Sequence, residues 1–192
     1  DVFDQLSFDE KIYAVPLQSS MVVVFYNKTV FQQTGISIPE TWDMILVSCE
    51  LLKQSGLLPI YVSGSDSWAS GQVLSVILCG MRASELYASL EQGNGWTDDR
   101  IAQGVDILAQ LYEREYINRD NFFDQGTGSA MQMLKTGEAA MVINGDWLSS
   151  FYRNSEETGA FSLPAVDPAY QTAAVQSVDQ CYAISSTCTN KD

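Results

Sequence analysis

The chain has 192 residues, 46% of them apolar and 18% charged, so it can bury a hydrophobic core and is too apolar for a disordered protein. Its formal net charge of −14 repels phosphate backbones and other anions. We therefore expect no nucleic acid partner and favour neutral or cationic ligands.

The first strand signal covers residues 11–27, which are rich in β-branched and aromatic side chains. Pro16 and the polar segment Gln18–Ser20 interrupt this stretch. The pattern predicts two strands joined by a bend. A second, shorter strand is predicted at residues 58–62, where the side chains are again apolar.

Two helices are predicted around that second strand. Apolar residues spaced as one helical face follow Thr41, and Gly56 stands where a C-terminal cap belongs. Trp42 falls on the inward stripe of this helix, so we expect it in the core. Residues 64–67 are predicted to form a loop that opens a helix at residues 68–81.

The middle of the chain continues the helical pattern. Thr97 is the predicted cap of a helix that ends near Tyr116. After a loop at residues 118–124, residues 129–136 are predicted to form a short helix that Gly137 stops.

Extended segments dominate the end of the chain. Residues 139–143 are predicted to form an apolar strand, after which Asn144–Asp146 turns into a short helix at Trp147. Residues 161–166 and 180–185 are predicted to be extended. Because strands and helices alternate along the sequence, we expect an α/β layered domain.

Histidine is absent, and the four cysteines lack the spacing of zinc or redox sites, so no metal or cofactor is expected. On a straight strand Cys188 would lie about 20 Å from Cys181, too far for a disulfide. Cys49 and Cys79 fall on two predicted helices, where they form either a disulfide or two buried thiols.

No apolar run reaches the roughly 18–20 residues that cross a bilayer. The sequence has neither an initiating Met nor a signal peptide, so we expect it to start within a mature or trimmed protein.

Several blocks together resemble the family 1 extracellular solute-binding proteins of ABC importers. They occur in the order typical of that family and cover nearly the whole chain: Ile12–Pro16, Phe25–Lys28, Pro39–Asp43, Thr136–Trp147, Leu163–Ala165 and Asp179–Ser185.

The resemblance implies a periplasmic-binding-protein-like type II fold, of which this chain is one three-layer α/β/α lobe plus hinge strands. Residues 15–178 would be the second lobe, residues 1–14 a remnant of the first lobe with a hinge strand, and residues 179–192 the returning hinge strand. It further implies a monomeric bacterial protein outside the cell, lipid-anchored or periplasmic. That protein would deliver a ligand to a membrane permease and would not be an enzyme.

The resemblance places the ligand between two lobes that close on it. A sugar needs aromatic plates for its C–H face and polar groups for its hydroxyls. Trp147 and Trp68 at helix starts are candidate plates, although each is also compatible with core packing. For Trp96 the sequence favours neither a ligand-facing position nor core packing. Asp66 is a candidate hydroxyl acceptor or a helix cap.

Further polar candidates lie beside these plates and in the two hinge strands. Asn144 and Asp146 precede Trp147 in its turn. Four residues would line the back of the cleft if the lobe assignment holds, and would otherwise be ordinary loop or strand-end polarity: Ser19, Ser20, Gln176 and Asp179.

Other functions fit less well. A glycosidase needs two carboxylates flanking the scissile bond, and nothing in the spacing of Asp66, Asp146 and Asp179 selects a pair. The same architecture also serves as the sensing domain of regulators and receptors, and an importer of this kind can carry a non-sugar solute such as a polyamine. These alternatives stay open at this point.

Overall fold

A computed structural model of the chain describes residues 2–66, 68–81, 86, 89–90, 92–93, 95–119, 127–152 and 155–190. The chain forms two compact units. The larger unit is Val22–Val175, and the smaller unit combines Asp1–Met21 with Gln176–Asp192. Ser67, the last residue of the loop predicted at residues 64–67, lies outside the described residues. So does most of the loop predicted at residues 118–124.

The larger unit is built on a sheet in the order β4-β5-β3-β6. Strand β5 (Ala139–Gly145) is antiparallel to β3 (Val15–Asn27) and parallel to β4 (Leu58–Tyr61), and β6 (Thr158–Phe161) is antiparallel to β3. All seven residues of β5 are buried. Strands that are covered on both faces have such uninterrupted apolar sequences, so β5 is the centre of the fold.

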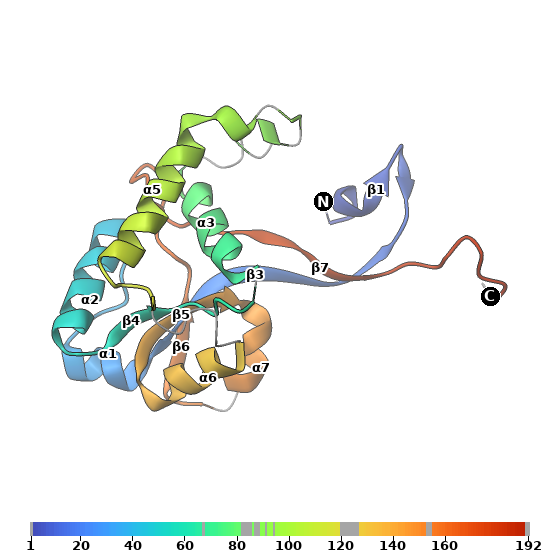
Figure 1. Cartoon of the computed structure of the whole chain (residues 1–192). Helices are drawn as coiled ribbons and strands as arrows, with labels where there is room; N and C mark the ends of the chain where they lie inside the picture. The colour runs from blue at the N-terminus through green and yellow to red at the C-terminus, as the bar shows by residue number, and fades with distance from the viewer. Residues whose placement is uncertain are drawn as a thin grey trace. The chain divides into compact units, whose positions relative to one another are not determined.

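Helices cover both faces of this sheet (Figure 1). One hydrophobic cluster joins the sheet to α1 (Lys28–Thr34), α2 (Trp42–Gln54), α3 (Ala69–Cys79) and α5 (Asp99–Glu113). A second cluster joins the opposite face to α6 (Thr127–Thr136), and the neighbouring α7 is Ser149–Tyr152. The two clusters confirm the predicted three-layer α/β/α arrangement.

The predicted helix ends are largely confirmed. The side chain of Thr41 accepts a hydrogen bond from the backbone N–H of Met44 at the start of α2, and Gly56 has the left-handed φ of 76° that suits a helix end. Gly137, with φ 78°, follows α6 in the same way. Trp42, which we expected in the core, packs against the larger cluster but is only partly buried, so this prediction holds in part.

The cap of α5 was predicted wrongly. Asp98, not Thr97, is its N-cap, and Thr97 belongs to the preceding 3-10 turn η2 (Gly95–Thr97). The Asp98 carboxylate accepts from the backbone N–H of Arg100 at 2.9 Å and pairs with its guanidinium at 2.6 Å. These hydrogen bonds lower the pKa of Asp98 to about 2. Asp98 is the better cap because its carboxylate accepts from the backbone N–H of Arg100 and also binds the Arg100 guanidinium.

The two strands and bend predicted for residues 11–27 are also wrong in part. Residues Lys11–Ile12 form β2, but β3 runs without a break through Pro16 and Gln18. Its pairing with β7 (Gln176–Tyr182) shifts register on both sides of Gln18. A two-stranded ribbon tolerates proline because alternate N–H groups face away from the partner strand.

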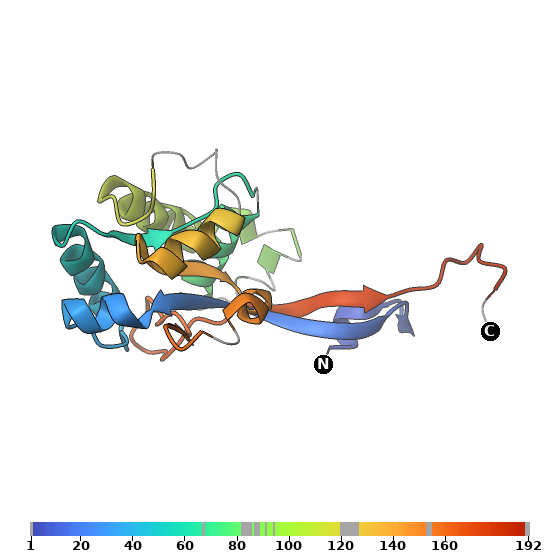
Figure 2. The ribbon, with the colours of Figure 1, turned by 90° about the horizontal axis from the view of Figure 1, so that it is seen from below.

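The smaller unit is made of hydrogen-bonded ribbons. Strand β1 (Ser7–Phe8) pairs with β2 across a turn at Asp9 and Glu10, and the first half of β3 pairs with β7. Figure 2 shows β3 and β7 side by side. Large apolar side chains of this unit are more than half exposed: Phe8, Ile12, Tyr13, Val15, Leu17, Tyr182 and Ile184.

All four cysteines lie in described parts of the chain, and none of them forms a disulfide. Cys49 is fully buried, and burial raises the pKa of its thiol to about 12. Of the two alternatives for this residue, the buried thiol is therefore the correct one.

Asn27 connects three elements of the larger unit, which generates a stability prediction. Its Oδ1 accepts from the N–H of Val30 to cap α1, and its Nδ2 donates to the carbonyl of Leu134 in α6, both at 2.9 Å. Asn27→Ala should lower the free energy of unfolding by about 2–3 kcal/mol, because a cap is lost and a buried carbonyl loses its donor. Thr41→Ala, which removes only an exposed cap, should cost about 1 kcal/mol. Urea unfolding compares the two variants, and equal losses would contradict the linking role of Asn27.

Candidate functional site

The carboxyl end of β5 carries three of the candidate residues. Asn144 is 1% exposed, and its Oδ1 accepts from the N–H of Gly145 at 2.7 Å. Asp146 begins the 3-10 turn η3 (Asp146–Leu148), which buried Leu148 anchors in the second cluster. The strand therefore ends in a short turn that fixes the direction of Trp147.

The ring of Trp147 lies directly over Gly145. A Cβ built on Gly145 would overlap three carbons of the six-membered ring. Gly145 has an ordinary extended backbone, with φ −73° and ψ 152°, so the glycine is required by this close approach and not by the turn. The ring can fold back onto the strand end only because residue 145 has no side chain.

Trp68 and Trp147 form an edge-to-face pair with ring centroids 5.8 Å apart. Trp68 occupies the N-cap position of α3 without a side-chain cap bond, and it is 42% exposed. The structure thus brings together the two predicted plates, although they come from different loops. Such a pair leaves indole surface available for the C–H face of a ligand.

Asp66 shapes the loop before Trp68. Its backbone N–H donates to the carbonyl of Ser63, and its own carbonyl accepts from the N–H of Ala69 at 2.9 Å. Burial raises the pKa of neighbouring Tyr61, and the charge of Asp66 adds to the effect. The carboxylate therefore lies near the end of β4, on the loop that also carries Trp68.

The candidates in the smaller unit form two hydrogen-bonded groups. In the first, Ser20 Oγ donates to Asp179 Oδ2 at 3.2 Å, and Gln18 Nε2 donates to both Ser20 Oγ and Asp179 Oδ2. In the second, Gln176 Nε2 donates to Ser19 Oγ at 3.1 Å. The structure therefore pairs Ser20 with Asp179 and Ser19 with Gln176.

Three further polar side chains lie next to the candidate residues, in the structure or in the sequence, and were not among the residues predicted for the site. Gln18 shares a strand face with Ser20, and its two-residue spacing from Ser20 was the available signal. Ser63 is 2% exposed, and its Oγ has no hydrogen-bond partner in the described parts of the chain. Gln72 lies one turn into α3, and its buried Oε1 also has no hydrogen-bond partner in the described parts of the chain. Ser63 and Gln72 flank Trp68 in sequence.

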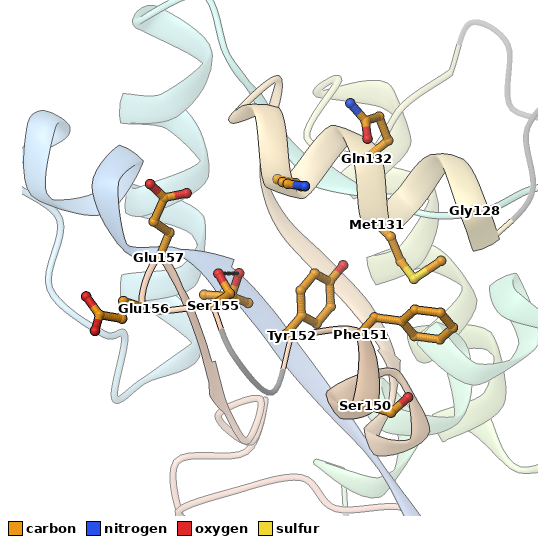
Figure 3. Close-up of a pocket in the computed structure, with 11 residues that line it drawn as sticks. Gly128, Met131, Gln132, Ser150, Phe151, Tyr152, Ser155, Glu156 and Glu157 are labelled. Atoms are coloured by element: carbon orange, nitrogen blue, oxygen red, sulfur yellow. Dashed lines mark hydrogen bonds between the residues drawn. The ribbon is translucent and has the colours of Figure 1, made fainter.

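A pocket of about 770 Å³ lies elsewhere in the larger unit, between α6, α7 and the segment before β6 (Figure 3). We call it the α6–α7 pocket. None of the candidate residues from the sequence lines it. It is lined by Gly128, Met131, Gln132, Lys135, Ser150, Phe151, Tyr152, Ser155, Glu156, Glu157 and Thr158.

Neither a metal site nor a membrane-spanning helix is found in the described ranges. Cysteine and carboxylate side chains do not gather there in groups of three that could hold a metal ion. No helix in those ranges is long and apolar enough to cross a bilayer.

The three-layer lobe is the fold of the type II periplasmic solute-binding proteins. The profile of the bacterial extracellular solute-binding protein family matches residues 1–192. This chain belongs to that family, as the sequence blocks indicated.

Known relatives are longer than this chain. The multiple sugar-binding protein of Streptococcus mutans serotype c is 25% identical over 169 residues, which are 84% of this chain and 40% of that protein. An uncharacterised ABC transporter extracellular-binding protein of Pyrococcus horikoshii is 28% identical over 166 residues, 82% of this chain and 37% of that protein. A solved chitin oligosaccharide binding protein matches with a TM-score of 0.89 at 24% identity, over 98% of this chain and 48% of that one, which shows the shared fold.

The Gly145–Trp147 contact generates a second prediction. Gly145→Ala should displace the Trp147 ring and lower the free energy of unfolding by about 1–3 kcal/mol, because the added methyl overlaps the ring. Gly71→Ala is the matched control, since a Cβ there meets nothing within 4 Å and a helix gains from the change. Thermal unfolding and tryptophan emission measure both variants. Unchanged emission in Gly145→Ala would contradict the seating of the ring.

Proposed function

We propose that this chain carries most of one ligand-binding lobe of an ABC-importer solute receptor whose ligand is a neutral sugar or oligosaccharide. The observation that carries the proposal is the Trp68–Trp147 pair, two indoles in contact where β4 and β5 lead into their helices. Membership of the solute-binding family supports the receptor role. The similarity to a multiple sugar-binding protein of Streptococcus mutans and to a chitin oligosaccharide binding protein supports a sugar as the ligand class.

The chemistry around the pair suits a neutral polyol. The indole surfaces match the C–H face of a sugar ring, and the carboxylates of Asp66 and Asp146 are strong acceptors for its hydroxyl groups. A net charge of −14 disfavours anionic ligands. Buried Ser63 Oγ is a further hydroxyl near the same loop that lacks a partner in the described residues.

The lobe assignment is part of the proposal. Residues 15–178 are proposed as the second lobe, and residues 1–14 and 179–192 as parts of the first lobe and its hinge strands. The larger compact unit, Val22–Val175, falls within these limits. Ser19, Ser20, Gln176 and Asp179 are proposed as ligand-facing or hinge-stabilising groups of the β3–β7 ribbon, which their mutual hydrogen bonds support.

The cellular role follows from the receptor function. The proposed protein is an extracellular monomer, lipid-anchored or periplasmic, that presents its ligand to a membrane permease and releases it chemically unchanged. Ligand binding then favours one conformation of the receptor, and the permease responds to that conformation.

A binding experiment tests the ligand class. In calorimetric titration with neutral mono- and oligosaccharides, Trp147→Ala should weaken binding at least tenfold, about 1.4 kcal/mol, because an aromatic contact surface is lost. Trp68→Ala should act in the same direction. Trp96→Ala is the control, since Trp96 is 72% exposed and lies in η2, away from the ring pair in sequence.

Two results would overturn the proposal. One is stabilisation of the protein in a thermal-shift screen by polyamines and by no saccharide. The other is a saccharide affinity that Trp147→Ala and Trp68→Ala both leave unchanged. Chromatography of the saccharide after incubation tests the absence of catalysis, and the appearance of hydrolysis products would revive the glycosidase alternative.

A further inference from the structure

The α6–α7 pocket has the dimensions of a small-molecule site. Its volume of about 770 Å³ falls in the range of roughly 300–1,000 Å³ that is common for ligand pockets. Its walls come from α6, from α7 and from residues 155–158, all within the larger unit. All the described residues that line it therefore belong to one compact unit.

One side of the pocket is apolar. Figure 3 shows the side chains of Met131, Phe151 and Tyr152 converging between α6 and α7. Phe151 is 64% exposed, whereas Tyr152 packs against Phe25 with ring centroids 5.3 Å apart. An exposed phenyl ring beside a hollow is the kind of surface on which the C–H face of a sugar packs.

The other side offers both donors and acceptors. Lys135 and Gln132 on α6 can donate, and the carboxylates of Glu156 and Glu157 can accept. The Ser155 and Thr158 hydroxyls lie 3.3 Å apart at the same edge, in hydrogen-bond contact with each other. Two carboxylates disfavour anions and the ammonium of Lys135 disfavours cations, so this mixture suits neutral hydroxyl groups, each of which donates and accepts.

Tyr152 supplies a buried group without a partner. Its hydroxyl oxygen is shielded from solvent and makes no hydrogen bond in the described ranges. Burial raises the pKa of this phenol to about 12, so the hydroxyl stays protonated at physiological pH. An unpaired buried hydroxyl is unfavourable. Because it is shielded, it is not counted among the groups that contact a ligand, and the pocket presents the edge of the Tyr152 ring instead.

We propose that the α6–α7 pocket is a second carbohydrate site, separate from the Trp68–Trp147 pair, that binds one neutral sugar ring against Phe151. The pocket is open and its described residues provide a single exposed aromatic plate, so its affinity should be weak, with a Kd of roughly 1 mM. Such a site would retain ligand near the receptor at high local sugar concentration. It goes beyond the proposed function and does not depend on it.

Amide chemical-shift titration separates the two sites. Glucose, galactose, N-acetylglucosamine and their disaccharides are added to the ¹⁵N-labelled protein and to Trp147→Ala. The expected result is a set of weak, saturable shifts at residues 128–135, 149–152 and 155–158 that persists in Trp147→Ala. Phe151→Ala and Glu157→Gln should each weaken these shifts at least fivefold. Glu157→Gln preserves size, and the backbone carbonyl of Glu157 keeps its bond to the N–H of Lys28.

Tyr170→Ala is the matched control, because Tyr170 is also a half-exposed aromatic residue of the larger unit and does not line the pocket. Phe151 is exposed, so its variant should keep the wild-type melting temperature. Saccharide shifts confined to residues 66–72 and 144–148 would overturn the second site while leaving the proposed function intact. Shifts at the pocket caused only by spermidine would overturn its ligand class. Equal weakening by Tyr170→Ala would overturn the role of Phe151.

Discussion

Burial of strand β5 along its whole length is the constraint on which the larger unit depends. The strand pairs with β3 along one edge and with β4 along the other, and its side chains point to both faces of the sheet, where they enter the two hydrophobic clusters. The helices on the two faces are attached to the sheet through the apolar side chains of these clusters. Asp146 and Trp147 directly follow the end of β5, so the position of this strand in the core determines where the two side chains of the candidate site lie.

The distribution of polar groups separates two kinds of surface in the larger unit. Beside the tryptophan pair, the carboxylate of Asp66 and the hydroxyl of Ser63 lie in one loop whose backbone is held by its own hydrogen bonds. In the α6–α7 pocket, Lys135 and Glu157 come from different elements and line the same hollow as the exposed Phe151 ring. The first surface is preorganised and the second is open, which is why they differ in expected affinity.

The sequence predicted those elements whose ends carry local chemistry. Thr41 and Gly56 marked α2 because caps act through neighbouring residues. The prediction of β3 was wrong at Pro16. A proline interrupts a strand only where its missing N–H would have bonded a partner strand, and which side of the strand has a partner is a tertiary property. The contact between Trp68 and Trp147 likewise depends on the order of β4 and β5 in the sheet. Phe151 and Tyr152 lie on a single helical turn, too short to give a periodic pattern.

The overlap between a side chain at position 145 and the Trp147 ring also constrains how the sequence can change. Gly145 has a backbone conformation that any residue adopts, so nothing in the turn itself selects glycine. Selection acts through the indole two residues later. Positions 145 and 147 should therefore covary: a lineage that loses the large ring at 147 is free to accept alanine or serine at 145. Once such a residue is present, the tryptophan can return only after glycine has been restored, so the two positions form an ordered evolutionary path.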